Sequence, residues 1–158
     1  MKSLGKVAWL GFFAVTLTLV GCSAVGTLPK DVDERAKNLA PAEGQALVYV
    51  VRPSNLGRAI GMTVTCDGRE MGKTGGQRYI YAMVDSGDHE FVSQAENKSE
   101  LTIVLEAGKT YYFEQQVKMG LLKARNKLVR LDDEEGRKRL LKCSLSKDLG
   151  ATPPEAGK

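Results

Sequence analysis

The stretch Gln45-Ala46-Leu47-Val48-Tyr49-Val50-Val51-Arg52 decides the fold class of this chain. Apolar side chains occupy both of its alternating faces, whereas a strand at a protein surface has only one apolar face. The turn-rich segment Pro53-Ser54-Asn55-Leu56-Gly57 then ends it. We therefore predict a central β-strand over residues 45–52 that is buried on both sides.

Shorter strand patterns follow it. Residues 60–67 alternate between apolar and polar, and the pair Asp67-Gly68 predicts a hairpin turn with residues 69–73 as the returning strand. Residues 78–84 lead into the turn Asp85-Ser86-Gly87-Asp88, and we expect them to pair with residues 89–94. Further strands are predicted over residues 101–105, 110–117 and 127–131. Short strands with turn signals every 8–12 residues or so favour an antiparallel sandwich or a small barrel.

One short helix is predicted to close the domain. Asp132 or Asp133 can cap its first turn, where Glu134 and Glu135 complement the positive end of the helix dipole. After residue 146 the composition becomes small and polar, and residues 147–158 are predicted to be a disordered tail. The expected fold is therefore mainly β: a small antiparallel β-sandwich over residues 45–146 with a short C-terminal α-helix.

The N-terminus has the layout of an export signal. Lys2 and Lys6 precede an apolar run over residues 7–20, which is shorter than the roughly 20 residues of a membrane-spanning helix. The run ends in Leu19-Val20-Gly21-Cys22. This motif resembles the lipobox of bacterial lipoprotein precursors, which are cut just before the cysteine. The resemblance implies a signal-peptide helix within residues 1–21.

The same resemblance implies a lipid anchor on Cys22. In that family the thiol receives diacylglycerol and the new amino group receives a further acyl chain such as palmitate, and we expect no cofactor besides this covalent lipid. Several acyl chains hold a protein in a membrane far more firmly than one does. Ser23 stands where an Asp would retain an enterobacterial lipoprotein in the inner membrane, which indicates the periplasmic face of the outer membrane. An ordinary secretory signal cut after Ala24, leaving no anchor, is the alternative.

Residues 22–44 are polar and small, and Pro29 and Pro41 interrupt them. Residues 31–37 are long enough for one or two helical turns, but their apolar positions are too few for a packed face. We therefore predict that residues 22–44 form the lipidated N-terminus and a flexible tether, which reaches on the order of 25 Å.

The charge of the exported chain is nearly balanced. The whole sequence carries 23 Lys and Arg against 19 Asp and Glu, and loss of Lys2 and Lys6 with the signal leaves a formal charge of about +2. Nucleic acid is not an expected partner of such a chain, because it leaves the cytoplasm.

Two cysteines are left after lipidation, Cys66 and Cys143. An even pair in an oxidising compartment favours one disulfide between them, and two buried free thiols are the alternative. The two thiols and the single histidine lack metal-ligand spacing, so no metal site is expected.

Three motifs follow one another along the chain: Ala46-Leu47-Val48-Tyr49-Val50-Val51-Arg52-Pro53, then Leu105-Glu106-Ala107-Gly108-Lys109-Thr110-Tyr111-Tyr112, then the helix ending in Lys142-Cys143. In this order they resemble a family of proteobacterial lipoproteins that carry a domain of unknown function. The strand and turn pattern also resembles sandwich domains of the transthyretin-like kind. The resemblance implies the sandwich fold and transfers no catalytic or ligand-binding residue.

No catalytic residue is predicted. His89 would need a nucleophile and an orienting acid in one cleft to act as a general base, and no motif supplies them. We expect instead that His89 lies at the end of a hairpin strand and hydrogen-bonds the turn.

The loop after residue 118 is the candidate contact site for a partner. It places apolar residues among cations, and the residues concerned are Met119, Leu121, Leu122, Lys123 and Arg125. One interpretation is a contact with a protein or with anionic lipopolysaccharide. The alternative is that the leucines fold back onto the core while the cations stay in water.

The function that we expect is a lipid-anchored, non-enzymatic sandwich domain that binds an envelope protein or supports envelope assembly. The alternative is a protein inhibitor of an envelope-attacking enzyme such as lysozyme.

Overall fold

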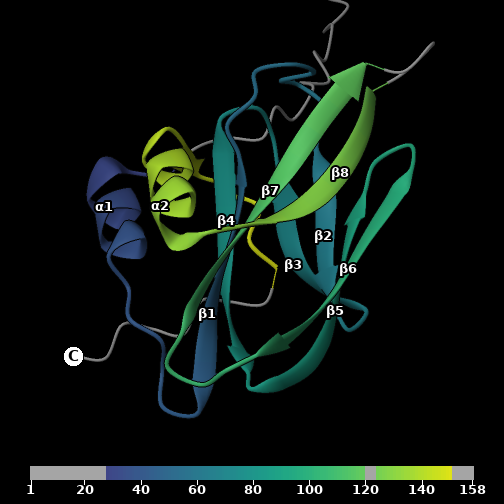
Figure 1. Ribbon diagram of the computed structural model, residues 1–158. Coiled ribbons are helices and arrows are strands. Elements are labelled where there is room, and N and C mark those ends of the chain that lie inside the picture. Colours follow the sequence, from purple (N-terminus) through teal and green to yellow (C-terminus); the bar gives the residue numbers. More distant parts are fainter. Residues whose placement is uncertain (1–27, 120–123, 151–158) are drawn as a thin grey trace, which may run out of the picture.

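The computed structural model describes residues 28–119 and 124–150, which form two stacked β-sheets and two short helices (Figure 1). The predicted signal peptide and Cys22 lie outside these residues. The elements are α1 (Lys30–Lys37), β1 (Gln45–Arg52), β2 (Met62–Cys66), β3 (Arg69–Thr74), β4 (Arg78–Asp85), β5 (Gly87–Gln94), β6 (Lys98–Leu105), β7 (Thr110–Met119), β8 (Ala124–Leu131), α2 (Asp133–Leu141) and β9 (Ser144–Leu145). One sheet has the order β8-β7-β1-β4-β9 and the other β3-β2-β5-β6. The predicted class, a mainly β sandwich with a C-terminal helix, is confirmed.

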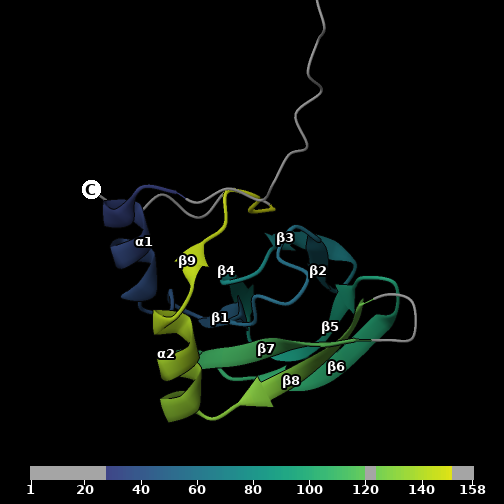
Figure 2. The ribbon, with the colours of Figure 1, turned by 90° about the horizontal axis from the view of Figure 1, so that it is seen from above.

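Strand β1 lies in the middle of the five-stranded sheet and separates two hydrophobic cores. The sheet core, between the two sheets, contains Ala46, Val48, Val50, Val64, Cys66, Met71, Ile80, Phe91, Leu105, Tyr111, Phe113 and Leu128. The helix core, on the other face of β1, contains Ala36, Leu47, Tyr49, Val51, Tyr79, Tyr112, Leu140, Cys143 and Leu145. Both helices lie on the side of the five-stranded sheet that faces away from the second sheet (Figure 2). Burial of β1 on both faces confirms the predicted central strand.

The five-stranded sheet is mixed, which corrects the expected antiparallel arrangement, and one predicted strand pairing is also wrong. β1 pairs antiparallel with β4 and parallel with β7, and β9 adds to β4 in parallel. Since β4 has a neighbour on each edge, β5 pairs instead with β2 and β6 in the other sheet. The expected pairing of residues 78–84 with residues 89–94 is therefore wrong. The chain passes from one sheet to the other at Gly87, whose φ of 138° is a conformation that glycine adopts readily.

Two predictions that depend on local sequence are confirmed. Asp67 and Gly68 form the turn between β2 and β3, with the positive φ values of 49° and 77° that a tight two-residue hairpin turn requires. Asp132 caps α2, because its carboxylate accepts a hydrogen bond from the backbone N–H of Glu135 at 2.8 Å.

Helix α1 corrects the predicted tether over residues 22–44. Leu28, Val32, Ala36 and Leu39 recur at helical spacing and pack in the helix core. These few apolar residues suffice because the sheet beneath them presents buried tyrosine rings, including that of Tyr49. The sequence pattern of α1 alone does not reveal that partner surface.

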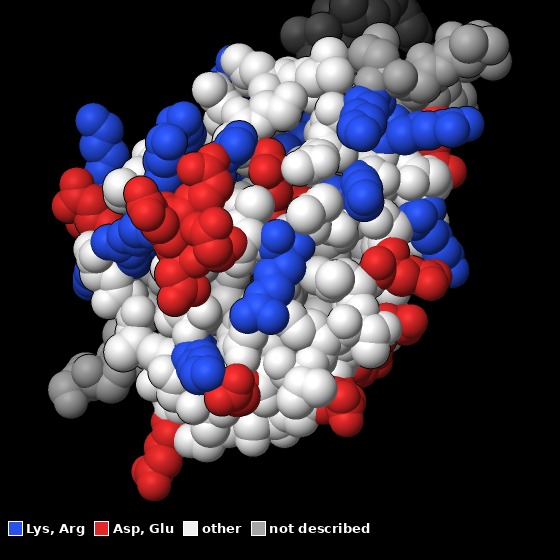
Figure 3. All heavy atoms as spheres, in the orientation of Figure 1, with Lys and Arg blue, Asp and Glu red and all other residues white. Residues whose placement is uncertain are grey.

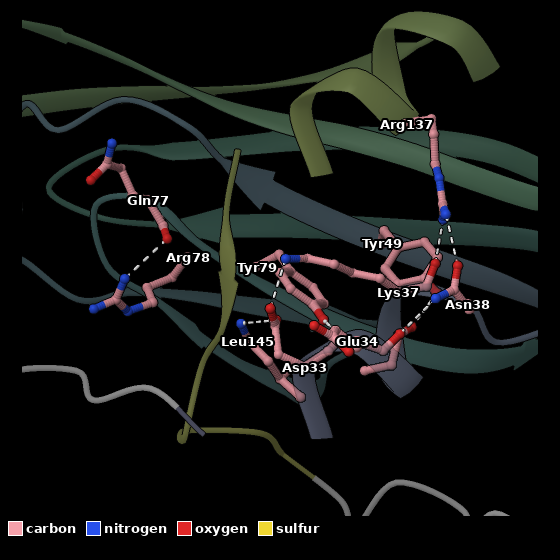
Figure 4. A network of polar contacts seen from close by, with 11 residues as sticks. Asp33, Glu34, Lys37, Asn38, Tyr49, Gln77, Arg78, Tyr79, Arg137 and Leu145 are labelled. Carbon is pink, nitrogen blue, oxygen red and sulfur yellow. Dashed lines mark hydrogen bonds and ion pairs between the residues drawn. The ribbon is translucent and has the colours of Figure 1, made fainter. Parts of the chain in front are cut away.

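Polar contacts also hold α1 against the sheet (Figure 4). The Asp33 carboxylate accepts a hydrogen bond from the backbone N–H of Leu145 at 2.7 Å and pairs with the ammonium of Lys37 at 2.7 Å. The Tyr49 hydroxyl donates to the carbonyl of Ala36. The described domain therefore includes most of the predicted tether.

The C-terminal boundary also differs from the prediction of a tail over residues 147–158. The backbone N–H of Lys73 donates to the carbonyl of Asp148, and that of Gly150 donates to the carbonyl of Met71, both at 2.8 Å. Gly72 permits this close approach, because a Cβ there would stand 2.3 Å from the Asp148 carbonyl oxygen. Residues 147–150 thus lie along β3, and residues 151–158 lie outside the described part.

Charged side chains of both signs are interspersed over the face shown in Figure 3. Acidic side chains gather over the region of α2, whose first turn holds Asp133, Glu134 and Glu135. In the part of the chain that the structure describes, neither helix is long and apolar enough to cross a membrane.

Candidate functional site

A cleft of about 540 Å³ opens beside the turns that follow β2 and β4, which lie in the lower half of Figure 1. Its apolar wall includes Met71, Tyr81 and Met83, and its charged wall includes Arg69, Glu70 and Asp85. Cys66, Asp67 and His89 line it as well. The cleft therefore combines apolar surface with convergent polar groups, which is the general character of a ligand site.

His89 lies on β5 and bonds two turns at once. Its Nε2 lies 2.8 Å from the carbonyl oxygen of Asp85, and its Nδ1 lies 2.6 Å from a carboxylate oxygen of Asp67. A carbonyl oxygen only accepts, so Nε2 is the donor in the first contact. The expectation that His89 lies at the end of a hairpin strand and hydrogen-bonds the turn is confirmed.

The Asp67 carboxylate is held by both of its oxygens. One accepts the backbone N–H of Glu90 at 2.9 Å, and the other faces Nδ1 of His89. These two contacts, the backbone N–H of Glu90 first, lower the pKa of Asp67 because they favour the charged carboxylate. The left-handed turn conformation of Asp67 directs the side chain toward β5, which pairs with β2.

The Cys66 thiol lies beside the same two groups. Its Sγ is 3.7 Å from the Asp67 carboxylate and 4.0 Å from Nδ1 of His89. Burial first, and then the neighbouring Asp67 charge, raise the pKa of the Cys66 thiol to about 12. The free thiol therefore keeps its proton near neutral pH.

This arrangement does not match a nucleophilic triad. In such a triad the histidine contacts the nucleophile with one ring nitrogen and the acid with the other. Here Cys66 and Asp67 both approach Nδ1 of His89, while Nε2 is bonded to a backbone carbonyl. A protonated thiol is also a weak nucleophile. The geometry suits the binding of a positive charge better than the activation of sulfur.

The structure corrects the expected disulfide between Cys66 and Cys143. Both are free, buried thiols, which is the alternative left open by the sequence. Cys66 belongs to the sheet core and Cys143 to the helix core. Because the five-stranded sheet lies between these cores, the two sulfurs are on opposite sides of that sheet.

The predicted partner-contact segment falls mostly outside the described residues. Leu121, Leu122 and Lys123 lie in the gap at 120–123. The backbone of Met119 ends β7 and pairs with Ala124 at the start of β8, and Arg125 is exposed. The segment thus joins two long paired strands, and the hypothesis of a partner contact there stays a prediction.

Sequence reasoning missed the role of Arg52. Its side chain is fully buried, and its guanidinium donates to the carbonyls of Ile60, Leu56 and Gly57 at 2.7–2.8 Å. Burial lowers the pKa of Arg52. Through these bonds Arg52 organises the loop between β1 and β2. The signal available in the sequence was a basic residue at the end of an apolar strand, just before Pro53.

Over residues 28–119 and 124–150 the fold and the cleft define a class: a mixed β-sandwich with two helices over one sheet and a cleft that has apolar and polar walls. A family described as "Protein of unknown function (DUF2846)" matches residues 42–127, which is more than half of the chain, and the chain belongs to this family. A protein of Haemophilus influenzae, named "Uncharacterized protein", is 27% identical over 134 residues, which cover 84% of this chain and 80% of that protein. The expected family of unknown function is thus confirmed, and neither comparison indicates an enzymatic family.

Proposed function

We propose that this chain is a lipid-anchored lipoprotein of the bacterial cell envelope, held on the periplasmic face of the outer membrane. The observation that carries the proposal is the motif Leu19-Val20-Gly21-Cys22 directly after a short apolar run with basic residues before it. Ser23 after the cysteine supports the outer rather than the inner membrane.

The start of the folded domain fixes how far it stands from such an anchor. The backbone N–H of Leu28 donates to the carbonyl of Leu145 at 3.4 Å, and α1 follows immediately. The six residue-to-residue steps from Cys22 to Leu28 span at most ~22 Å when fully extended. The domain therefore works close to the lipid surface, and the packed α1 replaces the longer reach that a tether over residues 22–44 would have.

We also infer that the domain acts by binding an envelope partner rather than by catalysis. The cleft beside Cys66, Asp67 and His89 supports binding. Nucleophilic chemistry is disfavoured there, because the Cys66 thiol is protonated and because Cys66 and Asp67 approach the same nitrogen of His89. An inhibitor of lysozyme is the competing function. Such inhibitors insert a rigid polar loop into the active site of the enzyme. The turn between β4 and β5, at Gly87, is short, and Gly76 in the turn between β3 and β4 lies close to the backbone of Arg58 and Ser54, so neither turn projects as such a loop.

The anchor is tested by expressing the full chain in an enterobacterial host. Mass spectrometry of the N-terminal peptide should find Cys22 as the first residue, carrying diacylglycerol and an acyl chain. Cys22→Ser should abolish the lipid and release the protein from membranes, whereas the matched variant Ser23→Ala should change neither. Ser23→Asp should shift the protein from the outer to the inner membrane fraction. An unlipidated N-terminus at Val25 would refute the anchor.

The binding role is tested in cells with a photo-crosslinking residue placed in the cleft. A probe at the exposed, cleft-lining Arg69 should give a specific adduct with one envelope protein, whereas a probe at the exposed Glu106, outside the cleft, should not. Equal labelling from both positions would count against a cleft-directed partner. Stoichiometric inhibition of lysozyme by the purified chain would favour the competing function instead.

A further inference from the structure

Three potential metal ligands converge at the closed end of the hairpin between β2 and β3. Cys66 Sγ, Asp67 Oδ2 and His89 Nδ1 lie within 4.8 Å of one another, at pairwise distances of 3.7, 4.0 and 2.6 Å. The spacing along the chain did not predict this cluster, because the pairing of β2 with β5 brings His89 to residues 66 and 67.

The hydrogen bonds of His89 leave Nδ1 facing a carboxylate oxygen. Nε2 donates to the Asp85 carbonyl, so Nδ1 is the ring nitrogen directed at Asp67, at 2.6 Å. Nitrogen and oxygen this close share one position for a cation, which a proton occupies in the hydrogen bond and a metal ion can occupy instead.

The surroundings hold these groups as metal sites usually do. A metal-binding histidine commonly donates its second ring nitrogen to a backbone carbonyl, as His89 does to Asp85. A ligating carboxylate commonly accepts a further hydrogen bond, as Asp67 does from Glu90. His89 is therefore oriented before any ion arrives, and Asp67 is held close to its ligating position.

The distances can be compared with those of a tetrahedral zinc ion. Zinc bonds of about 2.3 Å to sulfur and 2.0–2.2 Å to nitrogen and oxygen place ligand atoms roughly 3.4–3.6 Å apart. The two sulfur distances, 3.7 and 4.0 Å, are close to this range. The Asp67–His89 separation must grow by about 0.8 Å, which the half-exposed Asp67 side chain can provide by rotating.

The geometry points to a zinc-binding site formed by Cys66, Asp67 and His89, with its fourth coordination position open to the cleft. Thiolate, imidazole and carboxylate together favour zinc over magnesium or calcium, which prefer oxygen ligands alone. When the ion binds, two protons pass to solvent: that of the thiol, because a coordinating sulfur is deprotonated by the charge of the metal, and that shared by Nδ1 of His89 and the Asp67 carboxylate, because the ion takes its place. One thiolate and one carboxylate then balance the two charges of the ion.

The test is a cobalt(II) titration of the full-length protein purified in detergent, followed by displacement with zinc. Bound cobalt should give the near-ultraviolet thiolate-to-cobalt charge-transfer band and the visible bands of tetrahedral coordination. Cys66→Ser should abolish the charge-transfer band. His89→Gln and Asp67→Asn should weaken zinc binding by about 100-fold or more in calorimetry.

Cys143→Ser is the matched control, because it removes a buried thiol that lies in the other core. It should leave the cobalt spectrum unchanged. Circular dichroism in the presence of chelator checks that each variant is folded, and if Cys66→Ser unfolds, Asp67→Asn tests the same site from an exposed position. Absence of a charge-transfer band in the wild-type protein, or equal zinc affinity in the wild type and both His89→Gln and Asp67→Asn, would overturn the assignment.

Discussion

Gly136 in helix α2 should be a position where alanine destabilises the protein, against the usual rule for helices. The glycine is buried, and a Cβ at this position would stand 2.3 Å from Cγ and 2.4 Å from Cβ of Tyr112 on β7. Cβ and Cγ of Tyr112 lie next to the backbone and cannot move far by side-chain rotation. The Tyr112 ring also stacks on Tyr49, with ring centroids 5.5 Å apart. The helix must therefore move away from the sheet to accept a methyl group.

The expected magnitude follows from two opposing contributions. Alanine is favoured over glycine in a helix interior by about 1 kcal/mol. Overpacking costs about 1–3 kcal/mol, and a contact this short with immobile atoms belongs at the upper end of that range. Gly136→Ala should therefore lower the free energy of unfolding by about 2 kcal/mol.

Urea denaturation followed by circular dichroism measures this change, with the slope m as a check on two-state unfolding. Lys138→Ala, at an exposed position of the same helix, serves as the control and should stay within about 0.5 kcal/mol of the wild type. Near-ultraviolet circular dichroism should also change in Gly136→Ala, since the tyrosine stack lies beneath the helix. Stabilisation of Gly136→Ala by about 1 kcal/mol, as for a solvent-exposed glycine, would refute the packing of α2 on Tyr112.

Three further outcomes can be measured on the same protein. Tyr49→Phe removes the hydroxyl that donates to the Ala36 carbonyl, and should lower the free energy of unfolding in urea by about 1–2 kcal/mol. It should also make α1 more sensitive to protease, and unchanged proteolysis would argue against the packing of α1 on the sheet. Arg52→Leu should cost about 2–3 kcal/mol, because it removes charged hydrogen bonds that the buried guanidinium donates to three partly buried loop carbonyls. Burial raises the pKa of Cys143 to about 12, so between pH 9 and 12 the unfolded chain loses a thiol proton that the folded chain keeps. Stability should therefore fall with rising pH by up to about 1.4 kcal/mol per unit from this group, and Cys143→Ala should show a shallower fall.

The parts of the fold that sequence predicts correctly are those decided by neighbours along the chain. The two apolar faces of residues 45–52, the Asp67-Gly68 turn and the Asp132 cap each depend on a few consecutive residues. Each signal has a direct physical cause in burial, left-handed backbone conformation or the unsatisfied N–H groups of a helix start.

The parts that sequence misses depend on contacts between distant segments. Helix α1 looks too polar to pack until the tyrosine surface beneath it is known, and Asp33 reaches across to Leu145 at the far end of the chain. The cluster of Cys66 and His89 likewise exists only because β2 and β5 are paired in the smaller sheet. Such contacts leave no pattern in neighbouring residues. A single sequence therefore predicts the strands and turns but not which distant residues come together in the site.

The position of β1 between two cores has a consequence for how the molecule opens. Its side chains contribute to the sheet core and the helix core in alternation, so neither layer can separate without exposing apolar surface of the same strand. Subglobal opening of only the helices or only the smaller sheet is thereby disfavoured, and the β1 amides should exchange with deuterium at the rate set by global unfolding. In a domain that opens in one cooperative step the cleft is preformed. A ligand can then bind to it without a local folding transition.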